Sequence, residues 1–146
     1  MARPSLTSWN PERLRMAREA KGWTTEQLAI HADLSGTAVH TYASGRHTPP
    51  PSALVALAAA LEVPTTELAP PPDPPRLFDL RFHAGHSVES LAQALGMAAS
   101  HTGVILRGSA RITEPGKWAD VLGVDEATVQ KAWQASRRET ADRHPQ

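Results

Sequence analysis

The chain has 146 residues, with 15 Lys and Arg against 15 Asp and Glu, so its formal net charge is zero. This balance excludes a uniformly basic protein that coats nucleic acid, so any affinity for DNA must come from a local arrangement of charge. The absence of cysteine excludes disulfides and thiolate metal sites and fits a reducing cytoplasm. No apolar run approaches 18 residues, so we expect no membrane partner.

The first predicted helix follows a short N-terminal arm, residues 1–9, which lacks the apolar core of a signal peptide. The arm carries one cation, Arg3, and we expect it to be flexible. Asn10 and Pro11 supply an N-cap and a proline at the first helical position, and Gly22 closes the helix.

Residues 24–45 are predicted to form two short helices joined by a tight turn. Thr24 and Gln27 have the spacing of a capping box, in which each side chain bonds to the backbone N–H of the other residue. Ser35 is a good N-cap for the second helix, which Gly45 ends. The residues predicted to face inward are Leu28, Ala29, Ala32, Val39 and Tyr42.

The outward face of the second helix carries small or hydrogen-bonding side chains and no carboxylate: Gly36, Thr37, His40, Thr41 and Ser44. A major groove of DNA admits such a face. No acidic residue lies between Asp33 and Glu62, as expected for a surface held against phosphates, although a short Ala-rich region also lacks acids by chance. Further along, a helical period is carried by Leu54, Leu57, Ala58 and Leu61, and a last short helix is predicted from Thr65 to Ala69.

Many of these residues match a known family pattern: Leu14, Arg15, Arg18, Gly22, Thr24, Glu26, Leu28, Ala29, Leu34, Ser35, Val39, Gly45, Pro49, Leu57, Ala58, Leu61 and Val63. With them, residues 10–68 resemble the XRE family, the lambda-repressor/Cro-like helix-turn-helix domains. The resemblance implies a five-helix domain that binds double-stranded DNA, usually as a homodimer. It departs from the family at Thr25, where a longer Gln commonly binds a phosphate, and at Ala43, where Glu is common.

This resemblance and the outward face together predict where DNA would bind. The recognition helix, residues 35–44, would enter the major groove, with base edges opposite Thr37, His40 and Thr41. Phosphates would be bound by Thr25, Arg46 and His47, although an ordinary solvated loop is the alternative for the last two. The complete candidate set is Thr25, Ser35, Gly36, Thr37, His40, Thr41, Ser44, Arg46 and His47.

Residues 70–75 are so rich in proline that they predict a polyproline-type linker between a domain at 10–69 and a second one at 76–141. With Ala69 the segment would span about 22 Å at about 3.1 Å per residue. Matching residues lie 63 positions apart on either side: Leu14 and Leu77, Arg18 and Arg81, Gly22 and Gly85, Glu26 and Glu89, Leu28 and Leu91, Ala29 and Ala92, Gly45 and Gly108. We therefore predict an all-α fold of two tandem five-helix lambda-repressor-like domains, the second a diverged copy, followed by a tail at 142–146.

The second copy keeps an acid-free window, residues 90–113, but changes its candidate DNA face. Val88 replaces a polar residue that would face a phosphate, and Thr102 stands where the recognition helix normally buries Val or Ile. The candidate second DNA contacts are Ser100, His101, Gly103, Arg107 and Arg111. Because they are a poor set for base recognition, dimerisation or binding of a protein partner is the competing role.

The last predicted helix begins at its cap, Asp125, and places Val129, Ala132, Trp133 and Ser136 on one face. For Trp133, packing within its own domain is the usual fate and an oligomer contact is the alternative. Arg137 and Arg138 are interpreted as a solvated helix end, with phosphate contact as the alternative.

No motif indicates an enzyme or a cofactor, and we expect neither. His83, His86 and His101 are weak metal-ligand candidates, because their spacing fixes no geometry and no carboxylate is suitably placed. We expect a cytoplasmic, nucleoid-associated bacterial transcription regulator, in the role of a repressor. The alternative is an adaptor or antitoxin-like module whose repeats bind a protein partner.

Overall fold

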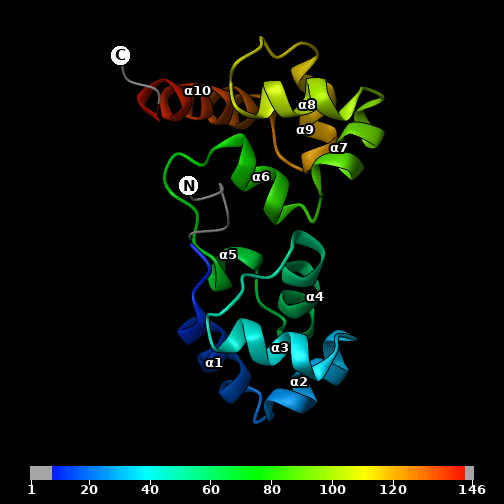
Figure 1. Cartoon of the computed structure of the whole chain (residues 1–146), viewed down its shortest axis with the longest axis vertical. Coiled ribbons are helices and arrows are strands. Elements are labelled where there is room, and N and C mark those ends of the chain that lie inside the picture. Colours follow the sequence, from blue (N-terminus) through cyan, green and yellow to red (C-terminus); the bar gives the residue numbers. More distant parts are fainter. Residues whose placement is uncertain (1–7, 144–146) are drawn as a thin grey trace. The chain divides into compact units, whose positions relative to one another are not determined.

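The structure, a computed structural model, describes residues 8–143, which form ten helices and no strand (Figure 1). The all-α fold expected from the sequence is therefore confirmed. The chain separates into two compact units with the boundary between Pro71 and Pro72. Arg3 and most of the predicted arm and tail lie outside the described residues. Within the described part of the chain, no helix is both long and apolar enough to cross a bilayer.

The first unit contains helices α1 (Pro11–Ala20), α2 (Thr25–Ala32), α3 (Gly36–Ala43), α4 (Pro51–Leu61) and α5 (Thr65–Leu68). Their apolar faces meet in one core, whose fully buried members include Leu14, Leu28, Val39, Leu54, Leu57 and Leu68. These are the positions at which helical periodicity repeats apolar residues, so burial of that stripe is what holds the five short helices together.

Trp9 belongs to this core and not to the arm. Its side chain is buried, and its indole Nε1 donates a hydrogen bond to the backbone oxygen of Tyr42, 3.1 Å away. The prediction that a flexible arm extends through residue 9 is therefore wrong at Trp9, because a large aromatic ring stabilises the fold by leaving water.

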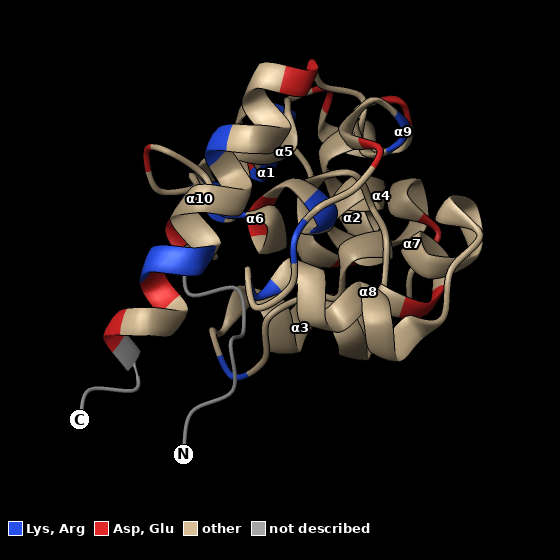
Figure 2. Cartoon of the chain, turned by 90° about the horizontal axis from the view of Figure 1, so that it is seen from above, with Lys and Arg blue, Asp and Glu red and all other residues tan. Residues whose placement is uncertain are grey.

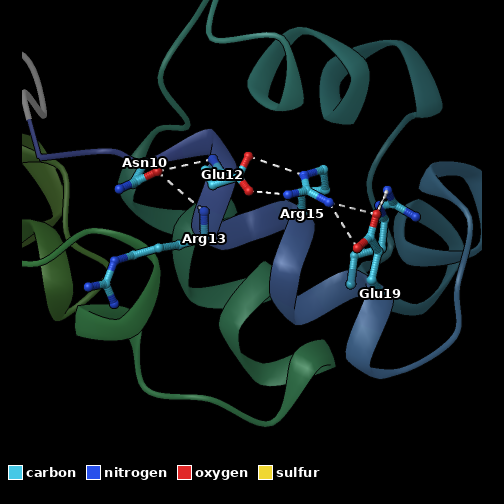
Figure 3. A network of polar contacts seen from close by, with 6 residues as sticks. Asn10, Glu12, Arg13, Arg15 and Glu19 are labelled. Atoms are coloured by element: carbon cyan, nitrogen blue, oxygen red, sulfur yellow. Dashed lines mark hydrogen bonds and ion pairs between the residues drawn. The ribbon is translucent and has the colours of Figure 1, made fainter.

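Helix α1 begins at Pro11 with Asn10 as its N-cap, as predicted from the sequence. The Asn10 side chain accepts from the backbone N–H groups of Glu12 and Arg13, at 3.0 and 3.3 Å. On the exposed side of the helix, Arg15 lies between two carboxylates, Glu12 and Glu19, and bonds to both (Figure 3). Its hydrogen bond to Glu12 is the main reason that the pKa of this carboxyl lies below its ordinary value.

The turn between α2 and α3 also forms as predicted. Thr24 and Gln27 make both bonds of the capping box, at 3.1 and 2.8 Å. Asp33 ends α2 in the left-handed conformation, with φ of 58°, and the Ser35 hydroxyl accepts from the N–H of Ala38 at the start of α3. Local side-chain bonds thus set both ends of the turn that orients α3.

The second unit contains helices α6 (Leu77–His83), α7 (Val88–Leu95), α8 (Ala99–Leu106), α9 (Pro115–Leu122) and α10 (Glu126–Arg143). Its core includes Leu77, Leu91, Ile105, Trp118 and Val129. Asp125 caps α10 as predicted by accepting from the Thr128 N–H at 2.8 Å. Trp133 packs against the core of its own unit, and its indole donates to the Ala110 oxygen at 3.0 Å.

The proline-rich segment bends at Asp73 and Pro74. The predicted polyproline conformation is therefore interrupted at these two residues.

Candidate nucleic-acid interface

The outward face of α3 holds the residues that the sequence pointed to. Thr37, His40 and Ser44 are exposed, and Gly36 and Thr41 are partly buried. The ribbon of α3 carries no Lys, Arg, Asp or Glu (Figure 2). The helix therefore presents an uncharged, hydrogen-bonding surface on the outside of the first unit.

Three of the candidate hydroxyl groups form hydrogen bonds with backbone groups of α3 or its ends. Ser35 accepts from the Ala38 N–H, Thr41 donates to the Ala38 oxygen at 2.7 Å, and Ser44 donates to the Thr41 oxygen at 3.0 Å. These bonds fix the two ends of α3. They also leave Thr37 and His40 as the side chains of the face that project without such a backbone bond.

The loop after α3 positions Arg46 and His47. Gly45 has φ of 80°, a conformation that glycine adopts without strain, and it turns the chain away from the helix. The N–H groups of Arg46 and His47 then bond to the Thr41 oxygen, at 3.1 and 3.3 Å. Their side chains are exposed beside the end of α3, while Thr25 lies partly buried at the start of α2.

One residue of this surface was missed by the sequence analysis. Glu26, on α2, places a carboxylate oxygen 2.9 Å from the Nε2 of His40, with side chains 67% and 57% exposed. The hydrogen bond from His40 is the main reason that the pKa of Glu26 lies below its ordinary value. The acid-free stretch noted in the sequence lies between Asp33 and Glu62. Glu26 precedes that stretch in sequence and reaches His40 only in the folded domain.

The contact with Glu26 determines which ring nitrogen of His40 donates a hydrogen bond and which accepts one. An ionised carboxylate only accepts hydrogen bonds, so Nε2 must carry the proton that it receives. In the neutral ring, Nδ1 is then an acceptor. Glu26 therefore selects one of the two tautomers of the imidazole.

The second unit repeats the local geometry of the first at positions 63 residues apart. Arg18 donates to the Trp23 oxygen at 2.5 Å, and Arg81 donates to the His86 oxygen at 2.7 Å. Ser87 caps α7 as Thr24 caps α2, and Gly96 ends α7 in the same left-handed conformation as Asp33. Helices α7 and α8 are therefore joined by a turn of the same kind as α2 and α3.

The candidate residues of the second unit lie on α8 and on the loop that follows it. Ser100, His101, Arg107 and Arg111 are exposed, and Gly103 is partly buried on α8. Val88 packs against the core, and Thr102 is fully buried with its hydroxyl donating to the Ala98 oxygen at 2.9 Å.

The structure does not bring the histidines of the second unit together as metal ligands. His86 Nδ1 lies 2.8 Å from the Ser90 hydroxyl. Among the described residues, no group of three or more His, Asp or Glu side chains is placed to hold a metal ion.

Comparison with known proteins identifies the class of the first unit. Residues 12–70 match the family model of a helix-turn-helix domain, which covers the whole of α2, α3 and the turn between them. Searches among curated proteins and among solved structures found no match. The chain thus contains a helix-turn-helix domain, a class that indicates DNA binding and is typically not enzymatic.

Proposed function

We propose that this chain is a sequence-specific regulator of transcription that binds double-stranded DNA through an XRE-type helix-turn-helix domain. The observation that carries the proposal is the exposed, hydrogen-bonding face of α3, a helix with no acidic residue of its own, presented by a domain of the helix-turn-helix class. A recognition helix needs hydrogen-bonding groups of this kind at the base edges. The one carboxylate described beside this face, that of Glu26 on α2, is bound to His40 at 2.9 Å. Action as a repressor in the bacterial cytoplasm, at the nucleoid, is part of the same proposal.

The candidate residues divide into three roles. Thr37 and His40 face base edges. Thr41 was also expected there, but its hydroxyl donates to the Ala38 oxygen, so together with Ser35 and Ser44 we assign it to holding the shape of α3. Phosphates are bound by Thr25, Arg46 and His47. Gly36 fits this arrangement, because a Cβ there would meet no atom of the protein within 4 Å. Nothing inside the domain requires a glycine, so we attribute its use to the close approach of DNA.

The second domain is proposed to be a diverged copy that adds either DNA contacts or self-association. The repeated caps, left-handed helix ends and arginine–carbonyl bonds support common descent of the two units. One domain with so few cations on its DNA face would bind weakly, and a linked or dimeric second site raises the effective affinity. Half-sites on one face of the duplex would lie about 34 Å apart.

A specific observation supports the competing function, a module that binds a protein partner or a second copy of itself. Where α3 has His40 and Thr41, α8 has Gly103 and Val104, and Val88 stands in place of Thr25. The second domain has thus exchanged hydrogen-bonding groups for apolar ones at three positions of the proposed DNA-binding surface.

The test is selection of binding sites by the full chain from a randomised duplex pool at fixed salt. We expect one enriched motif with the natural sequence and its loss in the double variant His40→Ala/Arg46→Ala. The double variant His31→Ala/Lys21→Ala is the matched control, because it removes an imidazole and a cation that contact Trp23 and, for Lys21, also Glu62. No enrichment by the natural chain, or equal enrichment by both variants, would sink the proposal in favour of the protein-partner function.

A further inference from the structure

The loop that follows α8 is held against α10 by three hydrogen bonds. Arg107 O accepts from the Thr140 hydroxyl at 2.7 Å, Gly108 O from Arg137 Nη1 at 3.4 Å, and Ala110 O from the Trp133 indole at 3.0 Å. Their donors lie on one face of α10, at helical spacing. The corresponding helix of the first unit, α5, has 4 residues against the 18 of α10, and the loop after α3 is exposed. Loop and helix therefore form one continuous surface that only the second domain has.

Both the loop after α8 and helix α10 contribute exposed arginines to this surface. Arg107 and Arg111 are exposed on the loop, and Arg137 and Arg138 are exposed on α10. We call these four residues the basic edge. Two acids of α10 lie close to these arginines in sequence: the Glu139 carboxylate pairs with Arg76 at 2.8 Å, and Asp142 is exposed one turn after Arg138. The segment from residue 90 to residue 113 contributes no carboxylate.

The basic edge continues onto the outer face of α8. A Cβ built at Gly103 would lie 3.6 Å from Nη1 of Arg107, so this guanidinium follows the helix over Gly103. Gly103 occupies the position that His40 has in the first domain. The second domain thus presents a cation where the first presents a hydrogen-bonding ring.

The structure assigns a second DNA contact to the basic edge: we infer that Arg107, Arg111, Arg137 and Arg138 bind the phosphate backbone of the duplex whose bases α3 reads. The inference rests on the proposed function. It makes the second domain a source of affinity that depends on charge and not on base pattern, because α8 offers Gly103 and Val104 in place of His40 and Thr41. Arginine suits this task since its planar guanidinium can form paired bonds to phosphate oxygens.

The experiment compares the salt dependence of DNA binding by the full chain and its variants on the duplex that the natural chain selects. Each phosphate contact contributes about 0.9 to the slope of log affinity against log salt concentration. The variant Arg107→Ala/Arg111→Ala should therefore reduce the steepness of this negative slope by about 1.8, which is two phosphate contacts, and leave the enriched motif unchanged. The control Lys117→Ala/Lys131→Ala removes two exposed cations of the same domain from outside the basic edge and should leave the slope as it is.

Three results would overturn the inference while leaving the proposed function intact. The first is an arginine variant with the same slope as the natural chain or the lysine control. The second is a changed motif in the arginine variant, which would mean that an arginine reads a base. The third is a change in oligomeric state with an unchanged slope, which would assign the edge to a protein partner. Failure of the natural chain to enrich any motif is a separate outcome and would remove the proposed function itself.

Discussion

The carboxylate of Glu26 lies 2.9 Å from His40 Nε2 and joins the first helix of the helix-turn-helix motif to the outward face of the second. An exposed hydrogen bond between two such side chains adds little to stability. Its importance here is chemical, since the acceptor-only carboxylate holds the proton on Nε2 and leaves Nδ1 as the acceptor of the neutral ring.

We predict that Glu26→Gln relaxes base discrimination by His40. A Gln amide can donate as well as accept, so the imidazole would no longer be held in one tautomer. Removal of a negative charge near the DNA should also raise binding to unrelated duplex. The ratio of affinities for the selected and a scrambled duplex, measured at one salt concentration, should therefore fall. An unchanged ratio would show that His40 does not depend on Glu26.

The structure shows which contacts of this surface were predictable. The capping box of Thr24 and Gln27 joins residues three apart, so sequence spacing alone defines it. Glu26 and His40 are 14 residues apart, and Trp9 and Tyr42 are 33 apart. Such pairs meet only when helices cross at a particular angle, which periodicity does not determine. The buried faces followed from hydrophobic spacing, whereas the contacts that modify the proposed DNA-binding face of α3 required the tertiary structure.

A second prediction concerns Gly36, at the first position of α3. Gly36→Ala should leave the free energy of unfolding unchanged or raise it by up to about 1 kcal/mol, because alanine favours helix and the added methyl meets no protein atom within 4 Å. The same methyl should weaken binding to the selected duplex if DNA approaches the backbone there. Urea unfolding and a binding titration of one preparation measure both effects. Undiminished affinity would mean that DNA does not approach α3 at Gly36.

The cap of α10 gives a pH prediction. Hydrogen bonds from the side chain and the backbone N–H of Thr128 lower the pKa of Asp125 from the ordinary value of 3.8. Since the folded pKa lies below the unfolded one, the stabilisation is complete above pH 3.8 and is lost as the pH falls through the folded pKa.

Asp125→Asn isolates this effect, because Asn is an equally good N-cap but does not titrate in this range. The unfolding midpoints of the natural chain and the variant should lie close together at low pH, after protonation of Asp125. As the pH rises through the folded pKa of Asp125 toward 3.8, the natural chain should gain stability relative to the variant, and above that pH the difference should stay constant. A difference that does not vary with pH would contradict the assignment of the cap to the ionised form.

The final prediction compares two glycines that occupy corresponding positions after α3 and α8. Gly45 and Gly108 have φ of 80° and 74°, so an alanine at either position is strained by roughly 1–2 kcal/mol. At Gly45 the new Cβ would lie 3.4 Å from Pro11, an ordinary contact, but at Gly108 it would lie 2.5 Å from the backbone of Arg137. Gly108→Ala should therefore lower the free energy of unfolding by clearly more than Gly45→Ala, since α10 must move away from the loop. Denaturant unfolding of the two variants measures this difference, and equal losses would mean that the packing of α10 on the loop adds nothing to the requirement for glycine.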